Sequence, residues 1–149
     1  MNQLRLAKAL EHLVTAHGPI EGRTRLLKLV YLADKQWFDE TGQVYTEAKY
    51  YRWNHGPFAK EVLSALEWLD GLEVVQRRVP YFDGTRYEYV RGVGSRLEAV
   101  ELDPAFVAIL DGVASTWGPR PLSELLEHVY ADDAFTRLSF SAPLLGAAA

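Results

Sequence analysis

Apolar residues recur with helical spacing near the start of the chain. Within residues 3–16 they fall at intervals of three and four positions, on one face of a helix: Leu6, Leu10, Leu13 and Val14. The segment His17-Gly18-Pro19 predicts the end of this helix, because glycine favours a C-terminal boundary and proline cannot continue it. We therefore predict a first helix with a single buried stripe.

The next segment, residues 22–39, is apolar on two faces of one predicted helix. The first face carries Leu26, Leu29, Val30, Ala33 and Trp37. The second face carries Leu27, Tyr31 and Phe38. A helix with two apolar faces usually lies in the centre of its domain, so we expect this one to be central. Gly42 closes the helix or the turn that follows it.

Residues 47–53, Glu-Ala-Lys-Tyr-Tyr-Arg-Trp, predict a short strand rich in aromatic side chains. Successive side chains of a strand point to opposite faces, so Tyr51 and Trp53 share one face while Tyr50 and Arg52 share the other. Tyrosine, tryptophan and arginine suit both a core that anchors a tight turn and a binding surface. We expect one pair to belong to the core, and the sequence does not say which.

Two further elements follow this strand. Gly56-Pro57 predicts the start of a third helix, because proline is well tolerated at the first helical position, and Asp70-Gly71 ends it. Residues 72–79 and 85–91 then alternate apolar and polar side chains around Asp83-Gly84, which predicts a β-hairpin.

The last part of the chain predicts two more helices and a tail. Asp103-Pro104 predicts an N-cap and first helical position, and residues 121–130 carry another apolar stripe. We expect an α+β, mostly helical fold of about five helices around a small antiparallel sheet of three short strands. Residues 1–140 are expected to form a single domain, with 141–149 as a frayed C-terminal tail.

Composition narrows the class of protein. The 149 residues include no cysteine, so disulfides and thiolate metal sites are excluded, and the chain suits a reducing cytosol. Charges interrupt the apolar run within the first turns, so no signal peptide is predicted. No stretch approaches about 18 uninterrupted apolar residues, so we expect a cytoplasmic protein with no membrane segment.

Local signatures of catalysis are missing from the sequence. There is no Gly-x-Ser-x-Gly elbow and no phosphate loop, and Gly92-Val-Gly94 lacks the third glycine of a dinucleotide-binding loop. The four histidines lack a ligand spacing such as His-x-x-x-His. They are His12, His17, His55 and His128. We predict a protein that is not an enzyme and that needs no cofactor or metal.

A DNA-binding transcriptional regulator is the first alternative. The predicted hairpin resembles the wing of a winged helix because it carries four arginines: Arg77, Arg78, Arg86 and Arg91. A recognition helix should present basic or amide side chains to the bases, whereas the exposed side of the predicted third helix is acidic. The net charge of −4 also weighs against nucleic acid, so nucleic-acid binding is not the expected function.

Asp34 motivates a second alternative, because it interrupts an apolar helix. An uncharacterised enzyme with a pocket near Asp34 and His55 would use it as an acid or base. A buried carboxylate without a partner is costly, however, so a structural role is the default expectation. Its partner would be a basic side chain, Lys28, Lys35 or Arg52, or the N–H of a turn.

Several motifs together resemble a known family. Residues 25–34, Arg-Leu-Leu-Lys-Leu-Val-Tyr-Leu-Ala-Asp, are similar to the Leu-x-Lys-Leu-Leu-Tyr-x-Ala-Asp run of the SocA-like antitoxin domain, also called the Panacea domain. Thr41-Gly42 and then Tyr-Arg-Trp-Asn-His-Gly-Pro at residues 51–57 resemble its turn and aromatic strand. Residues 122–128, Leu-Ser-Glu-Leu-Leu-Glu-His, resemble its C-terminal element. The order and spacing of these motifs carry the resemblance.

The resemblance implies a bacterial or phage antitoxin that neutralises a toxin, encoded by a neighbouring gene, through direct protein–protein binding. It brings no catalytic or cofactor residues. The positions that match the signature, together with the aromatic turn, are candidates for the family scaffold or for partner contacts. They are Lys28, Tyr31, Asp34, Gly42, Tyr51, Trp53, His55, Gly56, Pro57 and His128. The expected partner is a cognate toxin, and the sequence leaves a homodimer open.

Overall fold

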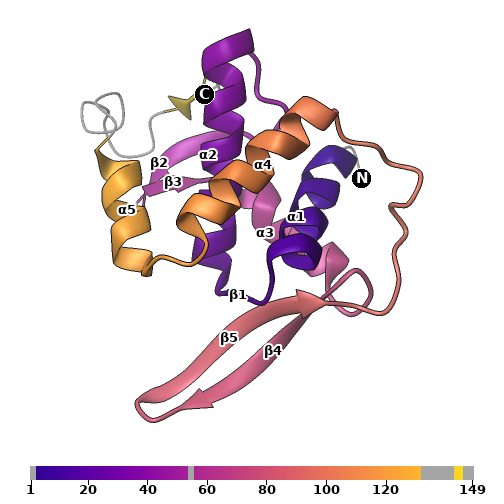
Figure 1. The fold of residues 1–149 in the computed structure, drawn as a ribbon, viewed down its shortest axis with the longest axis vertical. Coiled ribbons are helices and arrows are strands. Elements are labelled where there is room, and N and C mark those ends of the chain that lie inside the picture. Colours follow the sequence, from indigo (N-terminus) through magenta and orange to yellow (C-terminus); the bar gives the residue numbers. More distant parts are fainter. Residues whose placement is uncertain (1–2, 54–55, 132–142, 146–149) are drawn as a thin grey trace.

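The computed structural model describes residues 3–53, 56–131 and 143–145, and these residues form five helices and six strands (Figure 1). The helices are α1 (Leu4–His17), α2 (Arg23–Thr41), α3 (Lys60–Leu69), α4 (Pro104–Trp117) and α5 (Leu122–Tyr130). The strands are β1 (Ile20–Glu21), β2 (Tyr50–Trp53), β3 (Gly56–Phe58), β4 (Val74–Tyr81), β5 (Gly84–Arg91) and β6 (Pro143–Leu144). Within this part of the chain, no helix is long and apolar enough to cross a membrane.

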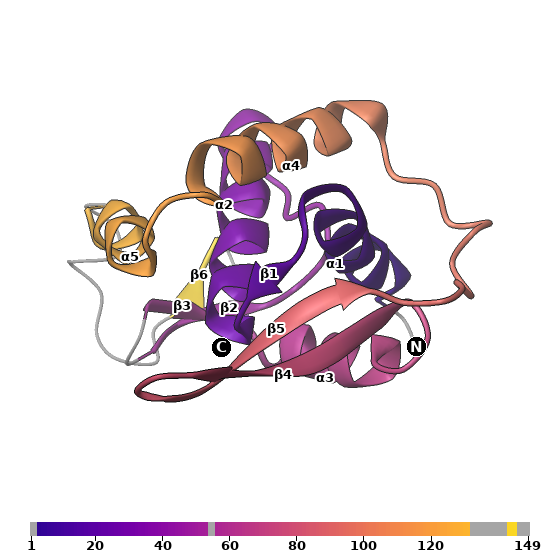
Figure 2. The same ribbon diagram turned by 60° about the horizontal axis from the view of Figure 1, so that its bottom comes forward.

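Helix α2 lies at the centre of the helical body, as its two apolar faces predict. It contacts α1, α4 and α5, and every residue from Leu26 to Asp34 is buried. Helix α1 lies between α4 on one side and α3 on the other (Figure 2). The core therefore forms from several helix layers, and α2 holds the signature residues Lys28, Tyr31 and Asp34 inside it.

Helix ends follow the sequence signals closely. Gly42 terminates α2 with a positive φ of 77°, and its N–H donates to the carbonyl of Phe38. Glycine adopts this left-handed conformation without the steric cost that a Cβ brings. At the start of α4, the side chain of Asp103 accepts a hydrogen bond from the N–H of Ala105 at 2.8 Å, and Pro104 follows it. The predicted N-cap is confirmed.

The α+β, mostly helical class with a small antiparallel sheet is confirmed. In the described residues the strands divide between two such sheets, one in the order β1-β5-β4 and the other in the order β3-β2-β6. Strands β1 and β6 have two residues each, so they are too short to show the alternation that predicts a strand. The β4–β5 hairpin is confirmed, but Tyr81 pairs with Gly84, so its two-residue turn is Phe82-Asp83, one position earlier than the predicted Asp83-Gly84.

The prediction that a third helix starts at Gly56-Pro57 is wrong. Gly56 has a φ of 100°, which no helix allows, and Pro57 pairs with Arg52 in the β2–β3 ladder. Helix α3 instead begins at Lys60. Proline suits the first turn of a helix and also an edge strand, since in both places its missing N–H costs little. The local sequence alone does not separate these two uses.

The expected C-terminal tail contains strand β6. Pro143 pairs with Tyr51 and Leu144 pairs with Tyr50, and the Leu144 side chain is buried. Positions 141–142 and 146–149 lie outside the described residues.

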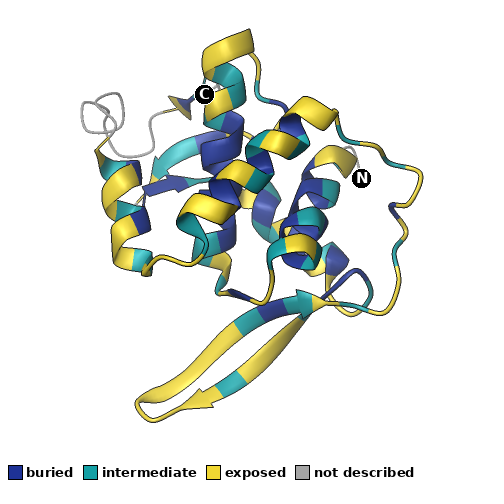
Figure 3. Ribbon diagram, viewed as in Figure 1, coloured by how far each residue is buried: buried dark blue, intermediate teal, exposed yellow. Residues whose placement is uncertain are grey.

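The β4–β5 hairpin projects from the body. Strand β1 pairs with β5 at Tyr89 and Glu88, and the N–H of Gly22 donates to the carbonyl of Tyr87. Beyond these positions, the described part of the hairpin is a two-stranded ribbon. Figures 1 and 3 show it extending away from the helices, with most of its outer residues exposed. We call residues 77–88 the hairpin arm.

Candidate functional site

Asp34 is fully buried, and its carboxylate accepts three hydrogen bonds. Thr46 donates through its backbone N–H at 3.1 Å and through its hydroxyl at 2.6 Å, and the hydroxyl of Tyr50 donates at 2.6 Å. Burial raises the pKa of Asp34 to about 6, although these hydrogen bonds act in the opposite direction. The expected structural role is confirmed in one of its forms, a bond from the N–H of a turn.

The aromatic strand sends one side chain into this network. Tyr50 is fully buried and packs edge to face on Tyr31, with ring centroids 5.0 Å apart. On the same strand, Trp53 is exposed and Tyr51 is half-buried. Tyr50 therefore belongs to the core, whereas the face of the strand that carries Trp53 is exposed to solvent. Tyr31 and Tyr50 join α2 to β2 around Asp34.

Lys28 makes the second buried polar contact of the signature. Its ammonium group donates to the carbonyl of Pro57 at 2.7 Å, which ties α2 to β3. Burial lowers the pKa of Lys28 to about 8. The lysine passes so close to Gly56 that a Cβ there would lie 3.2 Å from Lys28 Cε. Because glycine has no Cβ, position 56 can adopt the positive φ and can also accommodate the nearby Lys28 side chain.

Trp53 borders a small cavity next to this contact. Its ring stacks on Phe58 at a centroid distance of 5.8 Å. The cavity has a volume of about 230 Å³, and its lining includes Arg23, Lys28 and Gly56 besides the two aromatic rings. His55 was predicted beside this turn and lies outside the described residues.

His128 stands apart from the Asp34 and Lys28 contacts. It is exposed on α5 and stacks on Trp117 of α4, with centroids 4.1 Å apart. Both rings line a cavity of about 390 Å³ that also touches Tyr31. The structure therefore brings this signature residue near α2, at a different surface from Trp53.

Most of the signature residues act within the scaffold. Asp34 and Lys28 fasten loops to the central helix, and Asp34 has no exposed surface to offer a substrate. The sequence could not identify their partners, because the N–H of Thr46 and the carbonyl of Pro57 are backbone groups of a turn and of strand β3, and the Thr46 hydroxyl reaches Asp34 only through the fold. In the sequence, this site was indicated by a carboxylate, Asp34, inside an otherwise apolar helix.

The hairpin arm carries a different kind of surface. Tyr81, Phe82 and Tyr87 are exposed, and Phe82 at the tip is fully so. The sequence predicted the hairpin but did not single out these rings. The strand register places Tyr81 and Tyr87 on opposite faces of the ribbon, so the arm offers an aromatic side chain on each face as well as Phe82 at its tip. Tyrosine is enriched at the energetically dominant positions of protein interfaces.

The arginines of the arm are partly neutralised. Arg77 pairs with Glu88 across the ladder, and Arg86 pairs with Asp83 at 3.1 Å while lying over the ring of Tyr81. Arg78 and Arg91 are exposed.

Two histidines that the sequence left unassigned meet at a third site. His12 and His17 of α1 both contact Asp111 of α4. Local spacing could not reveal this cluster, because Asp111 lies more than ninety positions along the chain.

Comparison with known proteins agrees with the motifs. The profile of the antitoxin SocA-like, Panacea domain family matches residues 26–134, which is most of the chain and runs from the first turn of α2 past the end of α5. No curated protein and no solved structure matches the chain. The chain belongs to the antitoxin SocA-like, Panacea domain family.

Proposed function

We propose that this protein is an antitoxin that neutralises a toxin by binding it directly, and that the hairpin arm makes the central contact. The family supports the antitoxin-like role and a toxin partner in general. The observation that carries the assignment to the arm is the exposure of Tyr81, Phe82 and Tyr87 on a ribbon that projects from the body.

An aromatic arm suits protein recognition for physical reasons. Tyrosine and phenylalanine bury a large apolar area while immobilising only two side-chain torsions, so each contact costs little conformational entropy. A two-stranded ribbon by itself is marginally stable in water. Contact with a partner would remove the exposed rings from water and would hold the ribbon in one conformation.

The charge on the arm indicates the chemistry of the partner surface. Arg78 is exposed, and Arg77 and Arg86 belong to exposed pairs that contribute little by themselves. The proposed toxin surface is therefore an apolar groove with carboxylates at its rim. The aromatic rings would fill the groove, and the arginines would fix orientation and speed association.

The DNA-binding alternative receives less support. Two of the four hairpin arginines already have carboxylate partners, Glu88 and Asp83. The exposed positions of α3 are Lys60, Ser64 and Glu67, and Asp70 follows its end, so this helix offers phosphates one basic side chain against two carboxylates. In a salt-titrated shift assay on its own promoter, we expect no complex; a complex that weakens steeply with salt would favour this alternative.

A binding function also fits the buried state of Asp34 better than catalysis does. Its carboxylate oxygens already accept hydrogen bonds from Thr46 and Tyr50, so the residue holds the fold rather than facing a substrate. The proposed setting is the bacterial cytoplasm, where antitoxin and toxin are made together.

Co-expression with the product of the adjacent gene tests the proposal. We expect the full chain to restore growth against that product and to co-purify with it. Light scattering on the purified chain and on the complex distinguishes a toxin partner from a second copy of the antitoxin. Failure of both rescue and complex formation, or arm contacts that serve only a homodimer, would contradict the proposal.

A further inference from the structure

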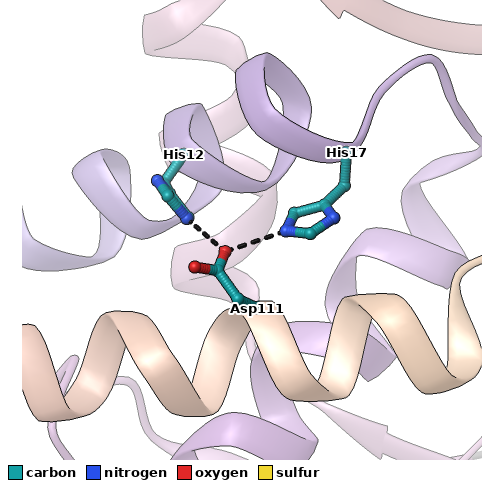
Figure 4. A group of neighbouring side chains, drawn as sticks. All are labelled: His12, His17 and Asp111. Atoms are coloured by element: carbon teal, nitrogen blue, oxygen red, sulfur yellow. Dashed lines mark hydrogen bonds and ion pairs between the residues drawn. The ribbon is translucent and has the colours of Figure 1, made fainter.

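Three side chains from two helices converge on one point at the end of α1. His12 and His17 direct their Nε2 atoms at the same oxygen of Asp111, at 2.7 and 2.8 Å (Figure 4). The three potential ligand atoms all lie within 4.8 Å of one another. Two imidazole nitrogens and one carboxylate oxygen form a donor set that suits divalent transition metals.

The distances allow an ion to enter with small movements. Zinc bonds to imidazole nitrogen and carboxylate oxygen are about 2.0–2.2 Å long, so tetrahedral ligand atoms stand roughly 3.3 Å apart. Each histidine nitrogen would therefore move away from the Asp111 oxygen by roughly half an ångström. The two histidine nitrogens, which lie within 4.8 Å of each other, would also approach to this spacing. Rotation about the side-chain torsions supplies such a shift without moving α1 or α4.

The cluster is neither sealed nor fully open. The side chains of His12 and His17 are 25% and 22% exposed, and that of Asp111 is 45% exposed. Such access allows an ion to enter and leaves room for a water molecule as a fourth ligand. Carboxyl groups are ordinarily ionised at neutral pH, as a metal ligand must be.

We propose that His12, His17 and Asp111 bind one divalent transition-metal ion of the zinc class, with water as the remaining ligand. The ion would replace the two hydrogen bonds by coordinate bonds and would fasten the C-terminal end of α1 to the middle of α4. His17 is three residues before β1, the strand that pairs with the base of the hairpin arm. The site therefore lies where the arm joins the helical body.

This site goes beyond the family assignment. Both histidines precede residue 26, where the match to the family profile begins. The proposal also stands independently of toxin binding, because its test uses the isolated chain and a metal ion alone.

Titration of the full, chelator-treated chain with zinc and with cobalt(II) tests the site. We expect one zinc per chain by calorimetry and an increase in the thermal unfolding temperature. Cobalt(II) should produce the visible absorption bands of a four-coordinate nitrogen and oxygen site. Three variants complete the design: His12→Gln and Asp111→Asn, which keep hydrogen-bonding capacity but lose a good ligand, and His128→Gln as the control. His128 is exposed and stacks on Trp117, outside the cluster.

Each outcome decides for or against the site. The proposal predicts at least a tenfold loss of zinc affinity in His12→Gln and Asp111→Asn, the disappearance of the cobalt bands, and unchanged binding in His128→Gln. Circular dichroism of the metal-free variants checks that they fold. No binding by the wild-type chain would mean that the three residues are only a hydrogen-bonded clamp. An equal loss in His128→Gln would mean scattered surface binding, and either result overturns the proposal.

Discussion

The signature residues around Asp34 and the hairpin arm contrast in almost every physical respect. Asp34, Lys28 and Tyr50 are buried, and their polar atoms are satisfied by partners from distant loops. The arm exposes its aromatic rings and pairs with the body only at its base. The first region carries motifs of the family, while the second is the proposed binding surface.

The two regions differ in how strongly folding restricts the residues at each position. A buried carboxylate or ammonium group that loses its partner is expensive, so the internal contacts restrict which residues can occupy those positions. An exposed ribbon is tolerant of change as far as folding is concerned, and its residues can vary with the partner.

Removing the Asp34 side chain should have the largest effect on stability. Asp34→Ala leaves the buried donors of Thr46 and Tyr50 without an acceptor, so we expect the free energy of unfolding to fall by about 4 kcal/mol. Asp39→Ala is the matched control on the same helix, because Asp39 is exposed and pairs only with Lys35. Asp39→Ala should lower the free energy of unfolding by no more than about 0.5 kcal/mol, as measured by urea unfolding. Equal losses would contradict the assigned role of Asp34.

The pH dependence of stability should report the buried state of Asp34. Its pKa of about 6 lies above the ordinary 3.8, so the folded chain keeps this proton to a higher pH than the unfolded chain does. Stability must then decrease as the pH rises from about 4 to about 6, by about 3 kcal/mol for this group. Asp34→Asn removes that contribution and leaves every other titrating group in place.

Between pH 4 and pH 7, the free energy of unfolding of the wild-type chain should therefore fall by about 3 kcal/mol relative to that of Asp34→Asn. Urea unfolding of both proteins measures this difference. A difference that stays constant, or that grows in favour of the wild type, would show that the three hydrogen bonds hold the carboxylate ionised in the folded state.

Gly56→Ala should have an intermediate effect. The φ of 100° and the nearby Lys28 side chain both oppose a Cβ, so we expect a loss of about 2 kcal/mol. Gly112→Ala is the matched control in α4, where space is open and the backbone is helical. It should stabilise the protein by about 0.5–1 kcal/mol. Thermal unfolding of the two variants should thus show shifts of opposite sign.

Changes in the arm should have the smallest effect on folding. Phe82→Ser removes a ring that is fully exposed, so the free energy of unfolding should change by no more than about 0.5 kcal/mol. A loss comparable to that of Asp34→Ala would show that the arm belongs to the scaffold, and the contrast between the two regions would disappear.

The sequence was most informative where structure is set locally. The Asp103 cap, the Gly42 helix end and the β4–β5 hairpin each depend on neighbouring residues, and each is confirmed, with the hairpin turn one position earlier than predicted. It was least informative where distant segments meet. The two-residue strands β1 and β6 exist only through pairing with other strands.

The candidate sites show the same limit. The N–H of Thr46 and the carbonyl of Pro57 satisfy buried groups as backbone atoms, which residue identity does not reveal. Asp111 joins two histidines from across the chain, so no motif spacing records the cluster. From the sequence alone, the aromatic residues of the arm resemble those of any strand. Their exposure to solvent becomes known only from the structure.

The affinity of the co-encoded toxin for two matched variants tests the central claim most directly. Phe82 and Val93 are both highly exposed apolar residues, but Phe82 is at the tip of the arm and Val93 follows the base of the hairpin. If the arm makes the central contact, Phe82→Ser should weaken toxin binding at least tenfold, while Val93→Ser leaves it within about twofold. Wild-type affinity in Phe82→Ser, or the same loss in both variants, would contradict the account.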